Sequence, residues 1–441
     1  MIRMSLFLGL LFIIGISTQV DGMAQKREAL DIRENLKLIE TVDLSGNKFY
    51  QVLFTDDNKL FITMKNPLTG KWSYQIGSER RSFFPCGGKE YSSGNPIMFT
   101  EDNKLFITMK NPLTGKWSYQ IGSERRSSFP RGGKEYSSGN PNFKKKLFVV
   151  ACPDLSVEVW DLNNGYKLLR FQIPKGKTPE YLIPHLSPDG KRIVFKPYML
   201  GEEAELWDAE EGGKIAVFNS SLTNCSSCNR TVYGMAFSPD SRKVAVSFGG
   251  MVFLWNAATG ELLNRLMDEK VRLYSSDPLS HNGAVRQILF SRDSQTIFTG
   301  SYDGVVKSWD VETGRLLNVF KGHKDRIESL ALSPDEKILA TGSRDKRVKL
   351  WSIESGKLLI TSGKNNDDVS SLSFSPDGKK ILSMTEERTF IWETATGKLL
   401  EQMSDIGLEN AGFSSDWRFV FIMDRKKNTI RLYKYKGNTE N

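Results

Sequence analysis

The sequence predicts an all-β fold made of one short unit that is repeated along the chain. Residues 54–96 and 99–141 are identical at 40 of 43 positions, so they form a tandem duplication with a 45-residue period. A looser form of this unit recurs to the end of the chain, and each copy reaches an aromatic residue 17 to 21 positions after its start. Such a period is typical of an array of identical supersecondary units and not of separate domains.

Each unit starts at an apolar anchor residue followed by a polar turn. The turn Leu332-Ser-Pro-Asp-Glu336 is a clear example, because serine, proline and aspartate are strong turn residues. Nine such anchors occur along the chain: Phe54, Phe99, Phe143, Leu186, Phe237, Phe290, Leu332, Phe374 and Phe413. The anchors therefore predict nine units.

Four short strands are expected in each unit. A β-rich run such as 337–341 follows the first turn, and after a second turn another run ends at the aromatic residue. A glycine turn, as at Gly314 or Gly397, then leads to an apolar strand such as 316–320. The aromatic positions are Trp72, Trp117, Trp160, Trp207, Trp255, Trp309, Trp351, Trp392 and Tyr433.

Several of these units resemble a known repeat. The pairs Trp160-Asp161, Trp207-Asp208 and Trp309-Asp310, with Gly322-His323 ahead of the unit that ends in Trp351, look like WD40 repeats, the blades of a β-propeller. The resemblance covers residues 36–436 and is strongest over 186–400. It is weaker in the two duplicated copies, where Trp-Ser stands in place of Trp-Asp.

The resemblance implies a single closed ring of four-stranded blades. Residues 36–44 read as a fourth strand with no unit before it, and the last unit stops after its third strand, so we expect the two ends to pair and close the ring. The anchors predict nine blades, with eight as the alternative if one duplicated copy is a recent insertion. The expected segments are a signal peptide at 1–22, a linker at 23–35, the propeller at 36–436 and a tail at 437–441.

The N-terminus predicts export from the cytoplasm. Arg3 precedes an apolar run at 6–16, and the small-residue pattern Val20-Asp21-Gly22 follows it, as in a cleavable secretory signal. An uncleaved anchor is the alternative, but 11 residues rise only about 16 Å as a helix, roughly half of the hydrocarbon core. We therefore expect a secreted or periplasmic protein with no stable membrane insertion after cleavage.

Two sets of polar residues recur in register. The resemblance implies that each set forms a structural hydrogen-bond tetrad inside its blade. An alternative is a Ser/His/Asp catalytic triad, but each set ends on a buried tryptophan and repeats at the same intervals, which favours the structural role. The sets are His281, Ser301, Asp303 and Trp309, and His323, Ser343, Asp345 and Trp351. No catalytic, cofactor or metal residues are predicted.

One loop between units carries two further hypotheses. Cys225 and Cys228 form a lone CxxC, for which a local disulfide is favoured over a zinc site, because no second pair of ligands follows. In a eukaryotic host, three N-x-Ser/Thr sequons would also be glycosylation sites, at Asn219, Asn224 and Asn229. The third histidine, His185, is expected to be a structural residue at a strand end.

The charge balance points to an interaction surface. The chain has 61 Lys and Arg against 52 Asp and Glu, a net charge of +9. One face of the predicted ring collects basic residues, here called the basic face: Lys324, Arg326, Arg344, Lys346, Arg347, Arg425, Lys426 and Lys427. We expect it to bind an acidic protein partner, with a merely solvated rim as the alternative. A nucleic-acid partner is not expected, because aromatic residues are not interleaved with these bases.

These observations favour a monomeric, non-enzymatic scaffold for protein–protein interaction outside the cytoplasm. Only three histidines occur, and no paired-carboxylate motif or phosphate-binding glycine loop is present. The alternative is an enzyme or carbohydrate-binding protein with its site at the central channel. A carbohydrate reader needs exposed aromatic residues, and Trp417 is the one tryptophan outside the repeated position.

Overall fold

The computed structural model describes strands between residues 30 and 172 and, more continuously, residues 182–197, 203–218, 231–271, 280–403, 411–414, 416–424 and 429–435. Throughout these residues the chain forms strands and turns, with no helix. The all-β prediction is confirmed. The predicted signal peptide lies outside the described residues.

Sheets of four antiparallel strands follow one another along the chain, each strand paired with the next in sequence. The N-terminal sheets are β3–β6 (Lys48–Phe54, Leu60–Lys65, Trp72–Ile76, Glu79–Phe83), β7–β10 (Ile97–Phe99, Leu105–Lys110, Trp117–Ile121, Glu124–Arg126), β11–β14 (Ser138–Asn142, Leu147–Ala151, Ser156–Asp161, Lys167–Gln172) and β15–β18 (Leu182–Leu186, Arg192–Pro197, Ala204–Asp208, Lys214–Phe218).

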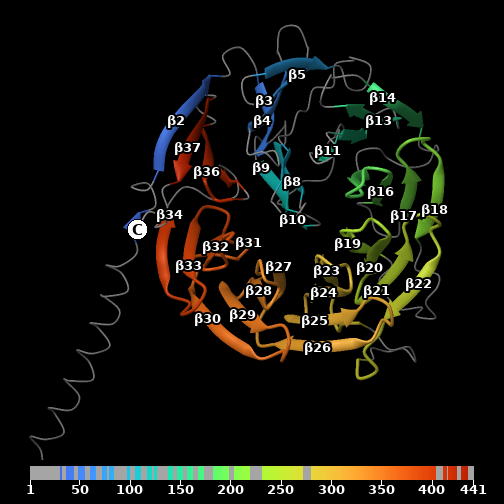
Figure 1. Ribbon diagram of the computed structural model, residues 1–441, viewed down its shortest axis with the longest axis vertical. Helices are drawn as coiled ribbons and strands as arrows, with labels where there is room; N and C mark the ends of the chain where they lie inside the picture. The colour runs from blue at the N-terminus through green and yellow to red at the C-terminus, as the bar shows by residue number, and fades with distance from the viewer. Residues whose placement is uncertain are drawn as a thin grey trace, which may run out of the picture.

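The same pattern continues toward the C-terminus. These sheets are β19–β22 (Val232–Phe237, Lys243–Phe248, Met251–Asn256, Leu262–Leu266), β23–β26 (Val285–Phe290, Thr296–Ser301, Val305–Asp310, Leu316–Lys321), β27–β30 (Ile327–Leu332, Ile338–Ser343, Arg347–Ser352, Leu358–Lys364) and β31–β34 (Ser371–Phe374, Lys380–Met384, Thr389–Glu393, Leu399–Met403). The sheets lie around a common centre, with first strands such as β27 inside and fourth strands such as β26 on the rim (Figure 1).

The last sheet joins the two ends of the described chain. β2 (Leu36–Asp43) pairs antiparallel with β37 (Thr429–Tyr435), which continues into β36 (Phe419–Asp424) and β35 (Ala411–Phe413). This is the pairing expected between the N-terminal strand and the last three strands. In addition, β1 (Leu30–Asp31) lies parallel to β34, inside the segment that we expected to be a linker.

The repeated tryptophan holds neighbouring blades together. In several blades it packs against a phenylalanine on the outer strand of the preceding blade. The Phe218 and Trp255 rings stack at 4.6 Å, and Phe320 meets Trp351 edge-on at 6.0 Å. All four side chains are almost fully buried, so they form the contact between sheets. Burying such large aromatic groups contributes several kcal/mol per contact, roughly 1.5–3 kcal/mol for each side chain.

The anchor turns also connect blades. In the turn after β19, Asp240 accepts a hydrogen bond from Ser238, and its own backbone N–H donates to Ser294 Oγ of the next blade at 3.2 Å. Ser294 has a φ of 62°, in the left-handed region where glycine is favoured. This non-glycine residue therefore places a side chain where it can bridge to a neighbouring blade.

Candidate functional site

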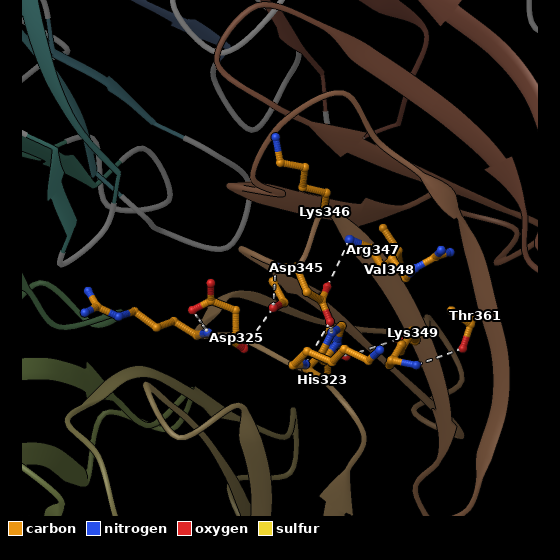
Figure 2. Close-up of polar contacts among 12 residues, drawn as sticks. His323, Asp325, Asp345, Lys346, Arg347, Val348, Lys349 and Thr361 are labelled. Carbon is orange, nitrogen blue, oxygen red and sulfur yellow. Dashed lines mark hydrogen bonds and ion pairs between the residues drawn. The ribbon is translucent and has the colours of Figure 1, made fainter.

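The polar set of blade β27–β30 forms one continuous buried chain of hydrogen bonds. His323 Nδ1 lies 2.8 Å from Asp345 Oδ2, and His323 Nε2 lies 2.7 Å from Thr341 Oγ1. Trp351 Nε1 donates to the same Thr341 oxygen at 2.9 Å. An Nδ1–H imidazole that accepts the threonine proton at Nε2 satisfies every group. Figure 2 shows Asp345 between His323 and the backbone of Arg347, with Lys346 pointing away.

Blade β23–β26 repeats this arrangement. Its histidine, His281, lies 3.3 Å from Asp303 Oδ2 and 2.8 Å from Thr299 Oγ1, to which Trp309 donates at 2.8 Å. His281, Thr299 and Trp309 are all fully buried. The two networks are therefore equivalent.

The two serines predicted as tetrad members are not in these networks. Ser343 Oγ instead donates to the Asp325 carbonyl at 2.9 Å and accepts the Asp345 N–H at 3.0 Å. Ser301 likewise accepts the Asp303 N–H at 3.2 Å. Both serines fix the tight turn that presents the aspartate, and the bridging hydroxyls belong to Thr299 and Thr341.

Strand register explains why threonine takes the bridging role. Trp309 pairs directly with Ile297 across the sheet. Thr299 is two residues from Ile297 on the same face, within diagonal reach of a tryptophan side chain, whereas Ser301 is four residues away. The spacing from histidine to aspartate in the sequence did not reveal this, but alignment of the two strands would have done so.

Blade β31–β34 builds a related network from different residues. Trp392 Nε1 donates to Ser383 Oγ at 2.8 Å, and Ser383 donates to Asn365 Oδ1 at 2.9 Å. Asn365 in turn donates to the Lys346 carbonyl of the preceding blade at 3.1 Å. This third network contains neither histidine nor aspartate.

Burial and hydrogen bonds together set the protonation states of these networks. Desolvation lowers the pKa of His281 below its ordinary value of 6.5, although the hydrogen bond to Asp303 works in the opposite direction. For Asp345, burial alone would raise the pKa, but the hydrogen bond and charge of His323 and the backbone N–H groups of Lys324 and Arg347 lower it to about 2. The carboxylate is therefore held ionised and the His281 imidazole neutral.

A buried ion pair stands next to His281. Lys307 Nζ lies 2.6 Å from Asp268 Oδ2 and donates to the Ser280 carbonyl at 2.8 Å. Lys307 and Asp268 are both more than nine-tenths buried. Their contacts tie β25 to the segment that enters the blade, so they serve to hold the blade together.

The basic face is less uniformly positive than the sequence predicted. Arg344 Nε lies 3.0 Å from Asp368 Oδ2 and 3.6 Å from Glu328 Oε1. Lys346 Nζ donates to the Asn366 carbonyl at 3.1 Å and lies 3.6 Å from a carboxylate oxygen of Asp367.

The other described members of the basic face differ in their surroundings. Arg347 Nη1 donates to the Ser362 carbonyl at 2.9 Å, and the Arg326 guanidinium lies 4.1 Å from the centre of the Tyr302 ring. Lys324 is exposed. The remaining members, Arg425, Lys426 and Lys427, lie outside the described residues.

The opposite face, formed by the anchor turns, also carries bases. Its exposed members include Lys191, Arg242, Arg292, Lys337, Lys379 and Arg418. Basic residues are therefore not confined to one end of the ring. Both faces also hold bases that lie near carboxylates, as Lys191 does with Glu210 and Arg292 with Glu336 on the opposite face.

The structure also locates two other residues singled out in the sequence, His185 and Trp417. His185 lies in β15 and is partly buried, and Trp417 is 5% exposed at the fourth position of an anchor turn. Trp417 is thus unavailable as an exposed carbohydrate platform. The hypotheses on Cys225, Cys228, Asn219, Asn224 and Asn229 fall outside the described residues. Among the residues that the structure describes, no cluster of three or more metal-ligating side chains occurs.

A family comparison matches the blades that carry these networks. Residues 219–256, 272–310 and 314–352 match the profile described as WD domain, G-beta repeat. The second and third segments contain the two histidine networks.

These three units are thus similar to WD40 repeats.

WD40-repeat relatives match a limited part of the chain. The human angio-associated migratory cell protein is 24% identical over 191 residues, 41% of each chain. WD repeat-containing protein 82 of Drosophila melanogaster is 26% identical over 177 residues, 40% of this chain and 50% of its own. The chain thus spans about two fifths of the length of the first of these relatives. WD40-repeat proteins generally mediate protein–protein interactions, and propellers of this kind are typically non-enzymatic scaffolds.

Solved structures share the fold. The C-terminal WD40 domain of Sif2 has a TM-score of 0.57 at 13% identity, covering 92% of this chain and 99% of its own. The computationally designed Ika8 protein has a TM-score of 0.55 at 17% identity, covering 89% and 98%. Among the described residues, no helix is long and apolar enough to cross a membrane.

Proposed function

We propose that this protein is a secreted or periplasmic, monomeric, non-enzymatic WD40 scaffold that binds an acidic protein partner through the basic face. The observation that carries this proposal is the role of the histidines. Both nitrogens of His323 are occupied, by Asp345 and Thr341, so no imidazole nitrogen is left to activate Ser343. The exposed chemistry of these blades is then the charged rim of the ring.

The proposal includes a closed ring of nine blades. The pairing of β2 with β37 supports closure, as do the contacts between β3 of the first blade and β35 of the last. A closed ring leaves no blade without a neighbour and gives the scaffold a rigid surface. Rigidity matters for recognition, because a preorganised surface loses little conformational entropy on binding.

Export is the part of the proposal that rests on the N-terminal sequence. The apolar run at 6–16 and the small residues before position 23 support cleavage after Gly22. N-terminal sequencing of the protein recovered from outside the cytoplasm is expected to begin at Met23. A protein that starts at Met1 and stays in the cytoplasm would contradict this part.

Affinity enrichment with residues 23–441 as bait tests the partner proposal. The variant bait carries Lys324→Gln, Arg326→Gln and Arg347→Gln, which avoids Arg344 and Lys346 because both of these bases lie near carboxylates. A matched control bait removes the same charge from the opposite face with Lys191→Gln, Arg242→Gln and Lys337→Gln. The control permits a comparison at equal net charge.

We expect mass spectrometry to identify a protein with an acidic surface that the wild-type and control baits capture and the basic-face variant loses. Capture should also weaken as salt rises, since exposed charges are screened over about 8–10 Å at physiological ionic strength. Equal capture by the two variant baits would contradict a role for the basic face. Turnover of a substrate by the purified chain would contradict the scaffold proposal.

A further inference from the structure

Three neighbouring blades bring aromatic rings close to basic side chains at the end of the propeller that carries the basic face. Both the Arg286 and the Arg326 guanidinium lie over the Tyr302 ring, 5.1 and 4.1 Å from its centre. Tyr233 of the preceding blade packs edge-on against Tyr302, with ring centres 6.3 Å apart. We call Arg286, Tyr302 and Arg326 the Arg–Tyr–Arg stack.

Backbone hydrogen bonds fix the positions of this stack. The Tyr302 N–H donates to the Ala284 carbonyl at 3.0 Å, which ties the β24–β25 turn to the start of β23. The Arg326 carbonyl accepts the N–H of Arg344 at 3.0 Å just before β27 begins. All three stack side chains are partly buried. The rings and guanidiniums are therefore presented by rigid strand ends and tight turns.

The charge of Arg326 differs from that of its neighbour Arg344. Arg344 is paired with Asp368 and Glu328, so its charge is compensated within the protein. Among the described residues, no carboxylate lies within ion-pair distance of the Arg326 guanidinium, and Asp325 Oδ1 instead accepts the Arg326 backbone N–H at 2.7 Å. Arg326 thus brings an uncompensated positive charge to the stack.

This geometry fits a carboxylate ligand. When a guanidinium lies face-on over an aromatic ring, its planar N–H edge stays available for two parallel hydrogen bonds. Arginine forms such bidentate bonds with carboxylates, and a second guanidinium nearby adds to the attraction. The exposed Lys324 lies close by in sequence and carries the same sign.

We propose that the Arg–Tyr–Arg stack binds a glutamate or aspartate side chain from an acidic peptide segment of the protein partner. The inference rests on the proposed function and deepens it, because it assigns recognition to Arg326, stacked on Tyr302, and not to the internally paired Arg344 and Lys346. The tyrosine ring holds both guanidiniums in place before the partner arrives. Binding then requires little further ordering of the arginine side chains.

Fluorescence anisotropy with a labelled hexaglutamate peptide tests the stack on the full chain. The test variants are Arg286→Gln with Arg326→Gln, and Arg326→Lys alone, which keeps the charge but loses the planar fork. The matched control is Arg242→Gln with Lys337→Gln on the opposite face. Thermal unfolding of each variant establishes that it is folded at the temperature of the titration.

We expect the double stack variant to bind hexaglutamate at least about tenfold more weakly than wild type, and the opposite-face control to stay within about twofold. Arg326→Lys should give an intermediate loss, and this result alone supports the inference if the double variant does not fold. The affinity of the double variant should also depend less on salt than that of wild type.

Three results would overturn the inference. Equal weakening by the stack variant and the control would place recognition elsewhere, and the enrichment experiment would still decide the proposed function. No binding of hexaglutamate by wild type at low salt would refute the stack as a carboxylate site. Displacement of the peptide by inorganic phosphate at lower concentration than by free glutamate would indicate a phosphate site instead.

Discussion

Two neighbouring blades satisfy the buried N–H of a tryptophan with different residues. In blade β27–β30, the buried indole N–H of Trp351 reaches Thr341, which is linked to His323 and so to a carboxylate. In blade β31–β34, Trp392 reaches Ser383 in the same way. The feature common to both is the hydroxyl that accepts the tryptophan N–H.

The two blades differ in the groups to which that hydroxyl is hydrogen-bonded. Blade β27–β30 uses a histidine and Asp345, whereas blade β31–β34 uses Asn365 and a backbone carbonyl. A catalytic group would require the histidine and the acid, but a structural group requires only that each buried donor finds an acceptor. The comparison therefore teaches that these networks serve to satisfy buried polar groups.

Removing the bridging hydroxyl is expected to have the largest effect. Thr341→Val leaves Trp351 Nε1 and His323 Nε2 unpaired in the core, which should lower the free energy of unfolding by about 2–4 kcal/mol. Thr341→Ser keeps the hydroxyl and should cost about 1 kcal/mol, the usual cost of losing one buried methyl group. Denaturant unfolding of both variants measures the difference, and equal losses would mean that the hydroxyl is not the bridge.

Removing the bridging hydroxyl of blade β31–β34 should also destabilise the protein, but by a smaller amount. Ser383→Ala removes the partner of Trp392 Nε1, while Asn365 keeps its bond to the Lys346 carbonyl. We expect a loss of about 1–2 kcal/mol in the free energy of unfolding. Ser383→Thr, which preserves the hydroxyl, is the control. A loss larger than that of Thr341→Val would reverse the comparison.

The tight turns that follow β24 and β28 offer a smaller test. Gly304 has a φ of 76°, and the equivalent residue in the next blade is Lys346 with a φ of 68°. A Cβ at Gly304 would lie 3.1 Å from the His323 and Asp325 carbonyl oxygens. Gly304→Ala should therefore destabilise by about 1–2 kcal/mol.

The reverse substitution completes that test. Lys346→Gly should stabilise the protein by about 0.5 kcal/mol, because relief of the left-handed strain exceeds the loss of a half-exposed ion pair. Thermal unfolding of the two variants gives the signs. Destabilisation by Lys346→Gly would show that the contacts of Lys346 with Asn366 and Asp367 outweigh the backbone strain.

Low pH should destabilise the Asp345 network of blade β27–β30 and not the Ser383–Asn365 network of blade β31–β34. The pKa of Asp345 is about 2 in the folded protein against an ordinary value of 3.8, so its stabilising contribution is complete above 3.8 and is lost as pH falls toward about 2. Folding lowers the pKa of His281, so this residue affects stability at a higher pH than Asp345 does. As pH falls below 6.5, the unfolded chain takes up a proton at this histidine more readily than the folded protein, which destabilises the folded state.

The variant Asp345→Asn isolates the contribution of Asp345 to the pH dependence of stability. Unfolding midpoints of this variant and wild type should converge as pH falls from 4 to 2, because wild type loses in that range what the variant already lacks. Parallel pH profiles would contradict an ionised Asp345 in the network. Ser383→Ala should leave the pH profile unchanged, since its network holds no carboxylate.

Much of the fold could be predicted because the information is local. The anchor turns, the repeated tryptophan and the strand spacing recur in every well-defined unit, and even the pairing of β2 with β37 followed from the incomplete units at the two ends. The resemblance to WD40 repeats also placed His323 and Asp345 in one network, and the recurrence of their spacing in the preceding unit supported it. Strand periodicity and turn chemistry act over a few residues, so one sequence is enough to read them.

The remaining features depend on packing between strands and blades. The choice of Thr341 over Ser343 is decided by cross-strand register. The pairing of Arg344 with Asp368 joins two blades, and so does the position of Arg326 over Tyr302. These contacts are set by the angle and distance between sheets, which charge counting along the chain does not contain.

Site-specific photo-crosslinking tests the central claim most directly. A photoreactive residue is placed at exposed position 324 on the basic face or at exposed position 337 on the opposite face, and each protein is irradiated with the captured partner. The account predicts that the partner crosslinks from position 324 and not from position 337. Crosslinking from position 337 alone, or equally from both, would contradict it.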